Sequence, residues 1–305
     1  MSAIQKLAGE IVDYAGLFPP AQLPLNEVIE NFESYLNSNF NWMLSRLVLP
    51  VSKLAELETS TTFQKSENRW RISALVPPVS ESESFDLAFS TIAEFNRRHD
   101  VSRKSVVDSI EIQTPTVESI VETGNRIPDG VQAFCEIPHL TDPFHHIQRL
   151  SELSRTNLMA KIRTGGVTED LIPTPSQVAR FIACCADSNV GLKATAGLHH
   201  PIRGEYRLTY DQDADSGTMF GFLNIFVAGC FAFSGHTDEQ WLEKVLTATD
   251  PGEFSVSDSE IQFAGQSVDR NQIESIRNTK LTTFGSCSFT EPTNELAAIG
   301  WLQTA

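Results

Sequence analysis

The chain has 305 residues, with 39 acidic against 23 basic side chains and a formal net charge of -16. The basic residues are scattered singly among more numerous acids, whereas a nucleic-acid-binding surface rests on clustered Lys and Arg. With 41% hydrophobic and 20% charged residues, the composition is that of a globular protein with a sizeable core. Nucleic acid binding and global disorder are therefore excluded.

Nothing in the sequence predicts secretion or membrane insertion. No basic segment followed by an apolar core stands at the start, and no window approaches about 18 uninterrupted apolar residues. The longest apolar run, Met219 to Phe233, contains two glycines and Asn224, which suits a buried helix. The five cysteines are odd in number and lie mostly in apolar segments, which favours reduced thiols. We therefore expect a cytoplasmic protein.

Short apolar or β-branched runs alternate with segments of helical spacing along the chain. The runs predict eight strands, at Ile11–Phe18, Arg46–Pro50, Arg71–Val76, Ser109–Gln113, Gln132–Ile137, Leu158–Arg163, Gly191–Thr195 and Leu281–Cys287. The helical segments are Leu25–Leu36, Ser52–Glu58, Ser84–Arg98, Val117–Thr123, Phe144–Glu152, Pro175–Asp187, Met219–Phe233, Asp238–Ala248 and Thr293–Leu302. Eightfold alternation of this kind predicts an α/β fold, a parallel (β/α)₈ (TIM) barrel.

One long segment interrupts the alternation, at residues 199–280 between the seventh and eighth strands. It contains the acidic stretch Asp211–Asp215, two helices and a hairpin that pairs Phe254–Val256 with Ile261–Phe263. We expect this insertion to cover one side of the barrel mouth, with part of it on the outer ring. Residues 1–305 are therefore predicted to form a single barrel domain that carries the insertion 199–280 before its last strand.

Charged side chains on two neighbouring strands are predicted to point into the barrel. Alternation on the sixth strand places Lys161 and Arg163 on one face and apolar residues on the other, and the apolar face should meet the helices. The same rule sends Lys193 and Thr195 inward on the seventh strand. Because catalytic groups of such barrels lie at the carboxyl ends of the strands, these cations are candidate site residues.

Two glutamates are predicted to face these cations. Alternation sends Glu111 inward on the fourth strand, whereas the pattern of the fifth strand is ambiguous and only places Glu136 near its end. One interpretation is a structural salt-bridge network inside the barrel. The other is an active site, in which a lysine close to other cations loses proton affinity and attacks a carbonyl to form a Schiff base.

Glycines and hydroxyl residues follow the last three strands. Glycine lets backbone N–H groups approach an oxyanion closely, and the loops after strands seven and eight are the usual phosphate site of barrels. Alone, each glycine also marks an ordinary turn. The residues predicted to bind substrate, together with Arg163, Glu136, Thr195 and His199, are Thr164, Gly165, Gly166, Gly197, Gly285 and Ser286.

These strand motifs resemble the class I aldolases, and most of all the deoxyribose-phosphate aldolase family. Its sixth strand reads approximately K-x-S-T-G, its seventh K-x-x-G-G and its eighth ends in G-x-S-S; here residues 161–165 read K-I-R-T-G, 193–197 K-A-T-A-G and 285–288 G-S-C-S. The resemblance implies that Lys161 forms the Schiff base, that Lys193 is the cation that lowers its pKa, and that Glu111 assists proton transfer. Arg163 and Glu111 replace a small hydroxyl residue and an aspartate of the family.

Other constellations remain open in the sequence. His199 follows strand seven and could join Glu111 and Glu136 in a divalent metal site, although no H-x-H or H-E-x-x-H spacing occurs. Asp13 lies near the end of the first strand. It would either contribute to the barrel mouth or form a buried, hydrogen-bonded pair under the barrel. Cys287 would be a nucleophile only with a partner base, and without one packing is the better interpretation.

The sequence thus predicts an aldolase-like lyase that uses Lys161, Lys193 and Glu111 on a small carbonyl metabolite, with or without a phosphate group. No cofactor is expected beyond the lysine imine, and a divalent metal is the alternative. A barrel that binds a small anion without catalysis is the non-enzymatic alternative. The expected partner is a small molecule that bears a carbonyl or a phosphate group. Neither nucleic acid nor a membrane is expected as a partner. A homo-oligomer is one option for assembly.

Overall fold

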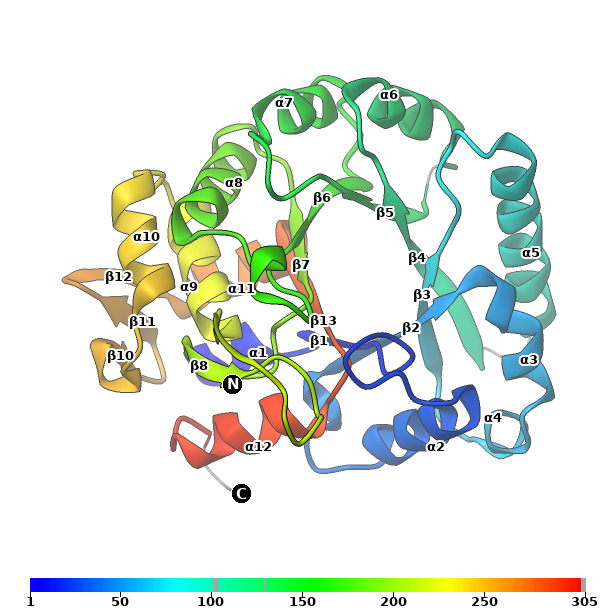
Figure 1. Cartoon of the computed structure of the whole chain (residues 1–305), viewed down its shortest axis with the longest axis horizontal. Coiled ribbons are helices and arrows are strands. Elements are labelled where there is room, and N and C mark those ends of the chain that lie inside the picture. Colours follow the sequence, from blue (N-terminus) through cyan, green and yellow to red (C-terminus); the bar gives the residue numbers. More distant parts are fainter. Residues whose placement is uncertain (101–103, 129, 303–305) are drawn as a thin grey trace.

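Eight parallel strands close into a barrel, and Figure 1 shows the ring of helices around it. The computed structural model describes residues 1–100, 104–128 and 130–302. Around the barrel the strands are β1 (Val12–Tyr14), β13 (Leu281–Ser286), β7 (Leu192–Thr195), β6 (Leu158–Arg163), β5 (Gln132–Glu136), β4 (Ser105–Gln113), β3 (Trp70–Leu75) and β2 (Leu44–Pro50). The predicted parallel (β/α)₈ barrel is confirmed.

Helices follow the barrel strands and cover them from outside. They are α2 (Leu25–Leu36), α3 (Leu54–Thr59), α4 (Thr61–Lys65), α5 (Ser82–Asp100), α6 (Val117–Arg126), α7 (Phe144–Glu152), α8 (Pro175–Asp187), α11 (Arg270–Thr279) and α12 (Thr290–Ala298). A short helix, α1 (Ala3–Ala8), precedes the first strand and packs on α11. Single 3₁₀ turns occupy Asn41–Met43, Val51–Lys53, Glu169–Leu171 and Pro251–Glu253.

Local chemistry explains why some helices have the bounds that the sequence predicts. Helix α8 begins at Pro175, whose fixed φ suits a first helical position. The hydroxyl of Thr174 accepts a hydrogen bond from the Gln177 N–H, and the Gln177 side chain accepts one from the Thr174 N–H. This reciprocal cap satisfies two backbone donors that the first turn leaves free.

The first strand and the last helix differ from the sequence predictions. Strand β1 ends at Tyr14 rather than Phe18, because the chain turns after Ala15 and places the apolar Phe18 at the barrel mouth. Helix α12 covers 290–298 rather than 293–302. Pro292 fits its first turn, where no intrahelical N–H is needed, and Gly300 follows the helix with a φ of +79°.

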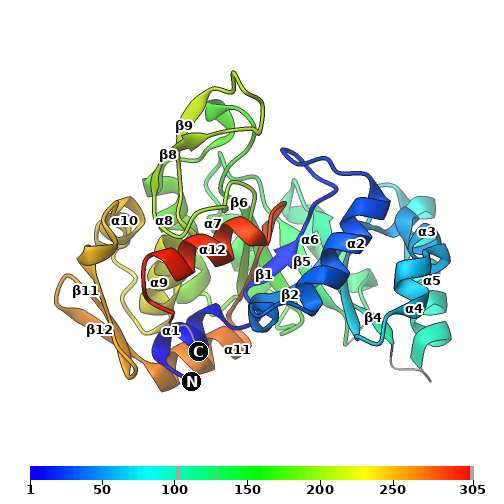
Figure 2. The same ribbon diagram turned by 90° about the horizontal axis from the view of Figure 1, so that it is seen from below.

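The segment between β7 and β13 forms a hairpin, followed by a group of helices and a small sheet. A hairpin of β8 (Gly204–Arg207) and β9 (Ser216–Met219) projects from one end of the barrel, as Figure 2 shows. Helices α9 (Phe222–Phe233) and α10 (Glu239–Thr247) pack with α8, and a sheet of β10 (Phe254–Val256), β11 (Glu260–Phe263) and β12 (Gln266–Asp269) follows.

The hairpin predicted at 254–263 is therefore present, with a third strand added to it. The sequence analysis missed the β8–β9 hairpin, because the polar Asp211–Asp215 stretch between its strands has no regular periodicity. It also missed α1, α4 and α11.

Helix α9 explains the longest apolar run of the chain. Its residues 222–232 are all buried between the barrel and the neighbouring helices. The one buried polar side chain in this run, Asn224, donates hydrogen bonds to the carbonyls of Val245 and Ala248 at 2.8 and 2.9 Å and accepts one from the Arg203 N–H. No helix within the described residues has the length and apolar character needed to cross a membrane.

Candidate functional site

A cavity of about 350 Å³ opens at the carboxyl ends of the barrel strands. Its walls are mainly apolar, with Phe18, Val48, Leu75, Leu171, Leu208 and Met219 among the lining residues. Leu208 and Met219 come from the β8–β9 hairpin and its loop, so the insertion does cover one side of the mouth as expected. The polar lining residues are Glu111, Gln113, Glu136, Lys161, Arg163, Thr195, His199 and Cys287.

The ammonium group of Lys161 lies between two carboxylates at the floor of this cavity. Its Nζ is 2.6 Å from Glu111 Oε2 and 2.6 Å from Glu136 Oε2. Strand register brings Glu136 next to Lys161, since the two residues pair across β5 and β6. The ambiguity of the fifth strand is thereby resolved, with Glu136 pointing inward.

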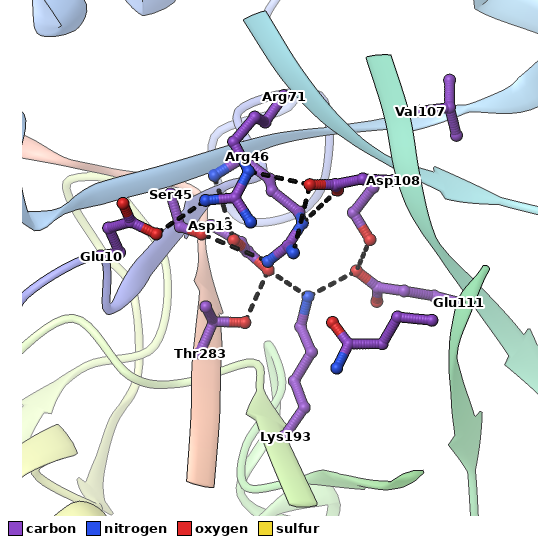
Figure 3. A network of polar contacts seen from close by, with 12 residues as sticks. Glu10, Asp13, Ser45, Arg46, Arg71, Val107, Asp108, Glu111, Lys193 and Thr283 are labelled. Atoms are coloured by element: carbon purple, nitrogen blue, oxygen red, sulfur yellow. Dashed lines mark hydrogen bonds and ion pairs between the residues drawn. The ribbon is translucent and has the colours of Figure 1, made fainter. Parts of the chain in front are cut away.

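Glu111 also binds the second lysine, so that one carboxylate bridges two ammonium groups. Its Oε1 is 2.7 Å from Lys193 Nζ and accepts a hydrogen bond from the Ser73 hydroxyl at 2.9 Å. Lys193 forms a second ion pair with Asp13, and Thr283 donates to the same Asp13 oxygen at 2.7 Å (Figure 3). Lys193 and Asp13 are fully buried and do not line the cavity.

The charges of this network oppose the pKa shift that the sequence predicts for Lys161. Burial alone would lower the pKa of Lys161, but Glu111 and Glu136 outweigh burial and raise it above the usual lysine value. Burial alone would raise the pKa of Glu111, and the two lysines hold it below its usual range. The expectation of a free amine at neutral pH is therefore wrong for the unliganded protein, because a carboxylate lies between the two cations.

The polar network extends away from the cavity towards the opposite end of the barrel. Asp13 accepts the backbone N–H of Arg46, whose guanidinium binds Asp108 at 2.6 Å. Arg71 binds Asp108 at 2.8 Å and Glu10 at 2.7 Å, as seen in Figure 3. The pairing of β3 with β4 shifts by one residue at Asp108, which breaks the simple alternation that sequence reasoning uses. The sequence analysis missed this chain of contacts.

Arg163 is the cation of the cavity wall that has no protein anion bound. It lies two residues after Lys161 on the same inward face, it is half-buried, and within the described parts of the chain it forms no ion pair. Its charge, after burial, lowers the pKa of the neighbouring His139. A guanidinium in this position has five N–H donors to offer to an anionic ligand.

The glycine loops that follow β6 and β7 pack against each other at the edge of the cavity. A Cβ on Gly165 would lie 2.8 Å from the Cα of Gly197, and Gly197 has a φ of +72°. The Thr164 hydroxyl donates to the carbonyl of Ala196 at 2.8 Å. The small residues therefore let the loops after β6 and β7 touch, which is a structural reason for their presence.

The predicted substrate-binding residues consequently separate into two groups. Those that line the cavity are Arg163, Gly166, Glu136, Thr195, Gly197, His199 and Gly285. Those outside its lining are Thr164, Gly165 and Ser286, and all three are buried. Of the predicted catalytic residues, Lys161 and Glu111 line the cavity, whereas Lys193 lies beneath it.

A second polar group lies on the same cavity, around His199. The imidazole Nδ1 is 2.9 Å from Glu291 Oε2, and Nε2 is 3.8 Å from Cys287 Sγ. The Tyr210 hydroxyl donates to the same glutamate oxygen at 2.9 Å and lies 3.6 Å from the sulfur. The partner base that the sequence did not supply for Cys287 is thus present. Only a tertiary contact reveals it, because Cys287 and His199 are 88 residues apart.

The metal alternative finds no ligand set in the described residues. There, no group of three or more His, Cys, Asp or Glu side chains is arranged to hold a metal ion. Glu111 and Glu136 bind Lys161, whereas His199 binds Glu291, so the three residues proposed as ligands are not directed to a common point.

The fold and the cavity place the chain among (β/α)₈-barrel proteins with a polar site at the carboxyl ends of the strands. Neither a protein-family model, nor a curated protein, nor a solved structure matches the chain.

Proposed function

We propose that the protein is a Schiff-base-forming lyase of the class I aldolase type, which acts on a small anionic carbonyl compound. The observation that carries the proposal is the position of Lys161, whose Nζ is on the floor of an apolar cavity and within 2.6 Å of two carboxylates. A primary amine, groups that accept and return its protons, and a cavity that excludes water are what imine formation requires.

Proton transfer within the network would free the amine for attack. Glu136 is the more exposed of the two carboxylates, with 16% of its side chain accessible against 4% for Glu111. Lys161 gives one proton to Glu136, and the free amine adds to the carbonyl carbon. A second N–H proton passes to the carbonyl oxygen, which forms the hydroxyl of the carbinolamine. Glu136 then returns its proton to this hydroxyl, which leaves as water. The resulting iminium carries the same single positive charge as the ammonium that it replaces.

The carboxylates therefore oppose the first step and favour the intermediate. They stabilise the ammonium of Lys161, which is why its pKa is raised, and they stabilise the cationic iminium by the same attraction. Glu111 stays anionic because Lys193 also binds it, so Lys193 acts as a positioning residue here rather than as the cation that frees the amine. A carboxylate then takes the proton of the substrate's β-hydroxyl, and the Cα–Cβ bond breaks. Its electron pair passes to the iminium to form an enamine, and the second fragment leaves as an aldehyde or ketone.

Arg163 supplies the reason to expect an anionic substrate. The named network of Asp13, Glu111, Glu136, Lys161 and Lys193 contains three carboxylates and two ammonium groups, so its formal charge is -1. The guanidinium of Arg163 balances this charge and has no protein anion bound in the described parts of the chain. A carboxylate or phosphate on the substrate would gain charge-assisted hydrogen bonds from it.

Reductive trapping tests the proposal directly. The protein is incubated with borohydride and a panel of aldehydes, 2-oxo acids and phosphorylated carbonyl compounds, and the adduct is located by peptide mass spectrometry. We expect a reduced adduct on Lys161 that is absent from Lys161→Met. Because the lysine pKa is raised, the rate of trapping should increase with pH between about 7 and 9.

Lys244→Met is the matched control, because it removes an exposed lysine from α10 with the same loss of charge. This variant should be trapped at the wild-type rate. An adduct on several surface lysines in place of Lys161, or no adduct with any compound of the panel, would overturn the proposal in favour of a barrel without imine chemistry.

A further inference from the structure

We infer that Cys287 is a second nucleophile of the same cavity, which accepts an acyl group from an activated ester or thioester with the help of His199 and Glu291. The inference goes beyond the lysine chemistry and does not rest on it. It stands on a thiol, an imidazole and a carboxylate in contact, which is the arrangement that activates cysteine and serine nucleophiles on unrelated folds.

Four separate elements bring these groups together. Cys287 directly follows β13, and His199 follows the neighbouring strand β7, so their loops meet at the mouth. Glu291 lies in the first turn of α12, and Tyr210 lies between β8 and β9. Of these groups, Cys287 and His199 line the main cavity, which gives a ligand access to the sulfur.

The hydrogen bonds set the protonation of the imidazole. Burial alone would lower the pKa of His199, but its contacts with Cys287 and Glu291 outweigh burial and raise the pKa to about 9. At neutral pH both ring nitrogens then carry protons, with Nδ1–H directed to Glu291 and Nε2–H to the sulfur 3.8 Å away. The Nε2–H therefore faces the sulfur and is placed to protonate a leaving group next to it.

The other titratable groups around the sulfur are tyrosines, which are neutral at this pH. Tyr14 of β1, Tyr35 of α2 and Tyr210 all interact electrostatically with Cys287, and burial is the first cause that raises the pKa of each. Burial alone would raise the pKa of Glu291, but the hydrogen bonds from His199 and Tyr210 outweigh burial and lower it, so this carboxylate is anionic. The charged group in contact with the sulfur is therefore His199.

Cys287 differs in its contact with an imidazole from the remaining four cysteines, Cys135, Cys184, Cys185 and Cys230. All five are buried and free of disulfides, and all lie in the described part of the chain. Burial raises the pKa of the four thiols. No imidazole hydrogen bond is recorded for any of them there. A structural cysteine needs only packing, whereas Cys287 has the partners of a reactive one.

The acyl-transfer step balances without an external oxidant or reductant. The thiolate of Cys287 attacks the carbonyl carbon of the donor, and the bond to the leaving oxygen or sulfur breaks. The leaving group takes the Nε2 proton of His199. The products are an S-acyl cysteine, a neutral imidazole and a free alcohol or thiol. The neutral imidazole can then accept a proton from water or from another acceptor of the acyl group.

The surroundings fit a donor with an apolar part. A side pocket of about 250 Å³ adjoins the main cavity and shares His199, Leu208 and Met219 with it. The two apolar side chains come from the β8–β9 hairpin and its loop, next to the imidazole. An acyl chain or an aromatic leaving group would bury its surface there.

Acylation of the wild-type protein by p-nitrophenyl acetate tests the inference. We expect a burst of p-nitrophenolate equal to the enzyme concentration, and an acetyl group on the Cys287 peptide that neutral hydroxylamine removes. In parallel, iodoacetamide at pH 7 should alkylate Cys287 about tenfold faster than Cys184. The reason for this difference is the contact of the Cys287 sulfur with the His199 imidazole, which Cys184 does not have in the described residues.

Variants separate the roles of the residues. Cys287→Ser should abolish the burst, His199→Gln should slow it by about a hundredfold or more, and Cys184→Ala should leave it unchanged. Acetyl groups confined to lysines, equal alkylation of all five cysteines, or a burst that persists in Cys287→Ser would each overturn the inference. The peptide that carries the adduct distinguishes this result from the lysine proposal, since imine trapping marks Lys161 and requires borohydride.

Discussion

The bridging carboxylate of Glu111 provides the sharpest test of the buried network. Replacement of Glu111 by Gln keeps the size of the side chain and removes the charge that Lys161 and Lys193 share. Each lysine retains one carboxylate, Glu136 or Asp13, but loses the other, and the buried site changes from a formal charge of -1 to 0. Two buried ammonium groups then lose half of their ion pairs.

The expected loss of stability is large for one substitution. Removing one partner from a buried ion pair costs about 3–5 kcal/mol, because it leaves the other charge uncompensated. The entropy of unfolding is about 2.1 cal/mol/K per residue, which for 305 residues gives about 0.64 kcal/mol/K. Glu111→Gln should therefore lower the Tm at pH 7 by about 5–8 °C.

The pH dependence of the stability difference between wild type and Glu111→Gln shows whether the charge of Glu111 causes it. The pKa of Glu111 in the folded protein lies below its value in the unfolded chain, which is about 4.3. Its contribution to stability is fully present above about pH 4.3 and is lost as the pH falls through the folded pKa. The difference in the free energy of unfolding between wild type and Glu111→Gln should therefore become smaller at acid pH.

Urea unfolding monitored by circular dichroism at pH 7 and at pH 3–4 measures the loss of stability in Glu111→Gln and its dependence on pH. Glu122→Gln is the control, since it removes an exposed carboxylate of α6 and should change stability by no more than about 0.5 kcal/mol. If Glu111→Gln at pH 7 falls within 1 kcal/mol of wild type, or if its deficit does not change with pH, the charge-bridging role of Glu111 is refuted.

Three further predictions concern other parts of the site. Arg163→Met should raise the concentration of a 2-oxo acid needed for half-maximal trapping by about tenfold or more, with a smaller effect on a neutral aldehyde; equal effects on both would contradict the anion-binding role. Gly197→Ala should cost about 2–4 kcal/mol in urea unfolding, because its φ is +72° and its Cβ would lie 2.9 Å from the Cα of Gly165. Gly265→Ala is the control, because the φ of Gly265 is +80° but its added Cβ would have no atom within 4 Å, so this variant should cost only about 1–2 kcal/mol. Equal losses of stability in the two variants would disprove the contact between the loops. The pKa of His199 is raised to about 9, so its stabilising contribution is present below about pH 6.5 and is lost as the pH rises through 9. The stability gap between wild type and His199→Gln should shrink by about 3 kcal/mol over that range, and a gap that stays constant would show that the contacts of His199 do not depend on its charge.

The sequence by itself determined the order of the eight barrel strands, most of the helices between them, and the inward direction of Lys161, Lys193 and Glu111. Hydrophobic periodicity reports these features directly, because a parallel barrel buries one face of each strand against helices and turns the other face into the interior. The alternation that sends Lys161 and Arg163 inward is local, so a single sequence is enough to detect it. The predicted helices Leu25–Leu36, Phe144–Glu152 and Pro175–Asp187 are confirmed for the same reason.

Only the tertiary structure decided which charges meet and what they do to one another. Glu111 lies between Lys161 and Lys193, so the pKa of Lys161 is raised where a like-charge argument from the sequence predicts a fall. The contact of Cys287 with His199 likewise joins loops far apart in the chain. The sign of an electrostatic effect depends on distances of a few ångströms across neighbouring strands, and strand order and register set those distances.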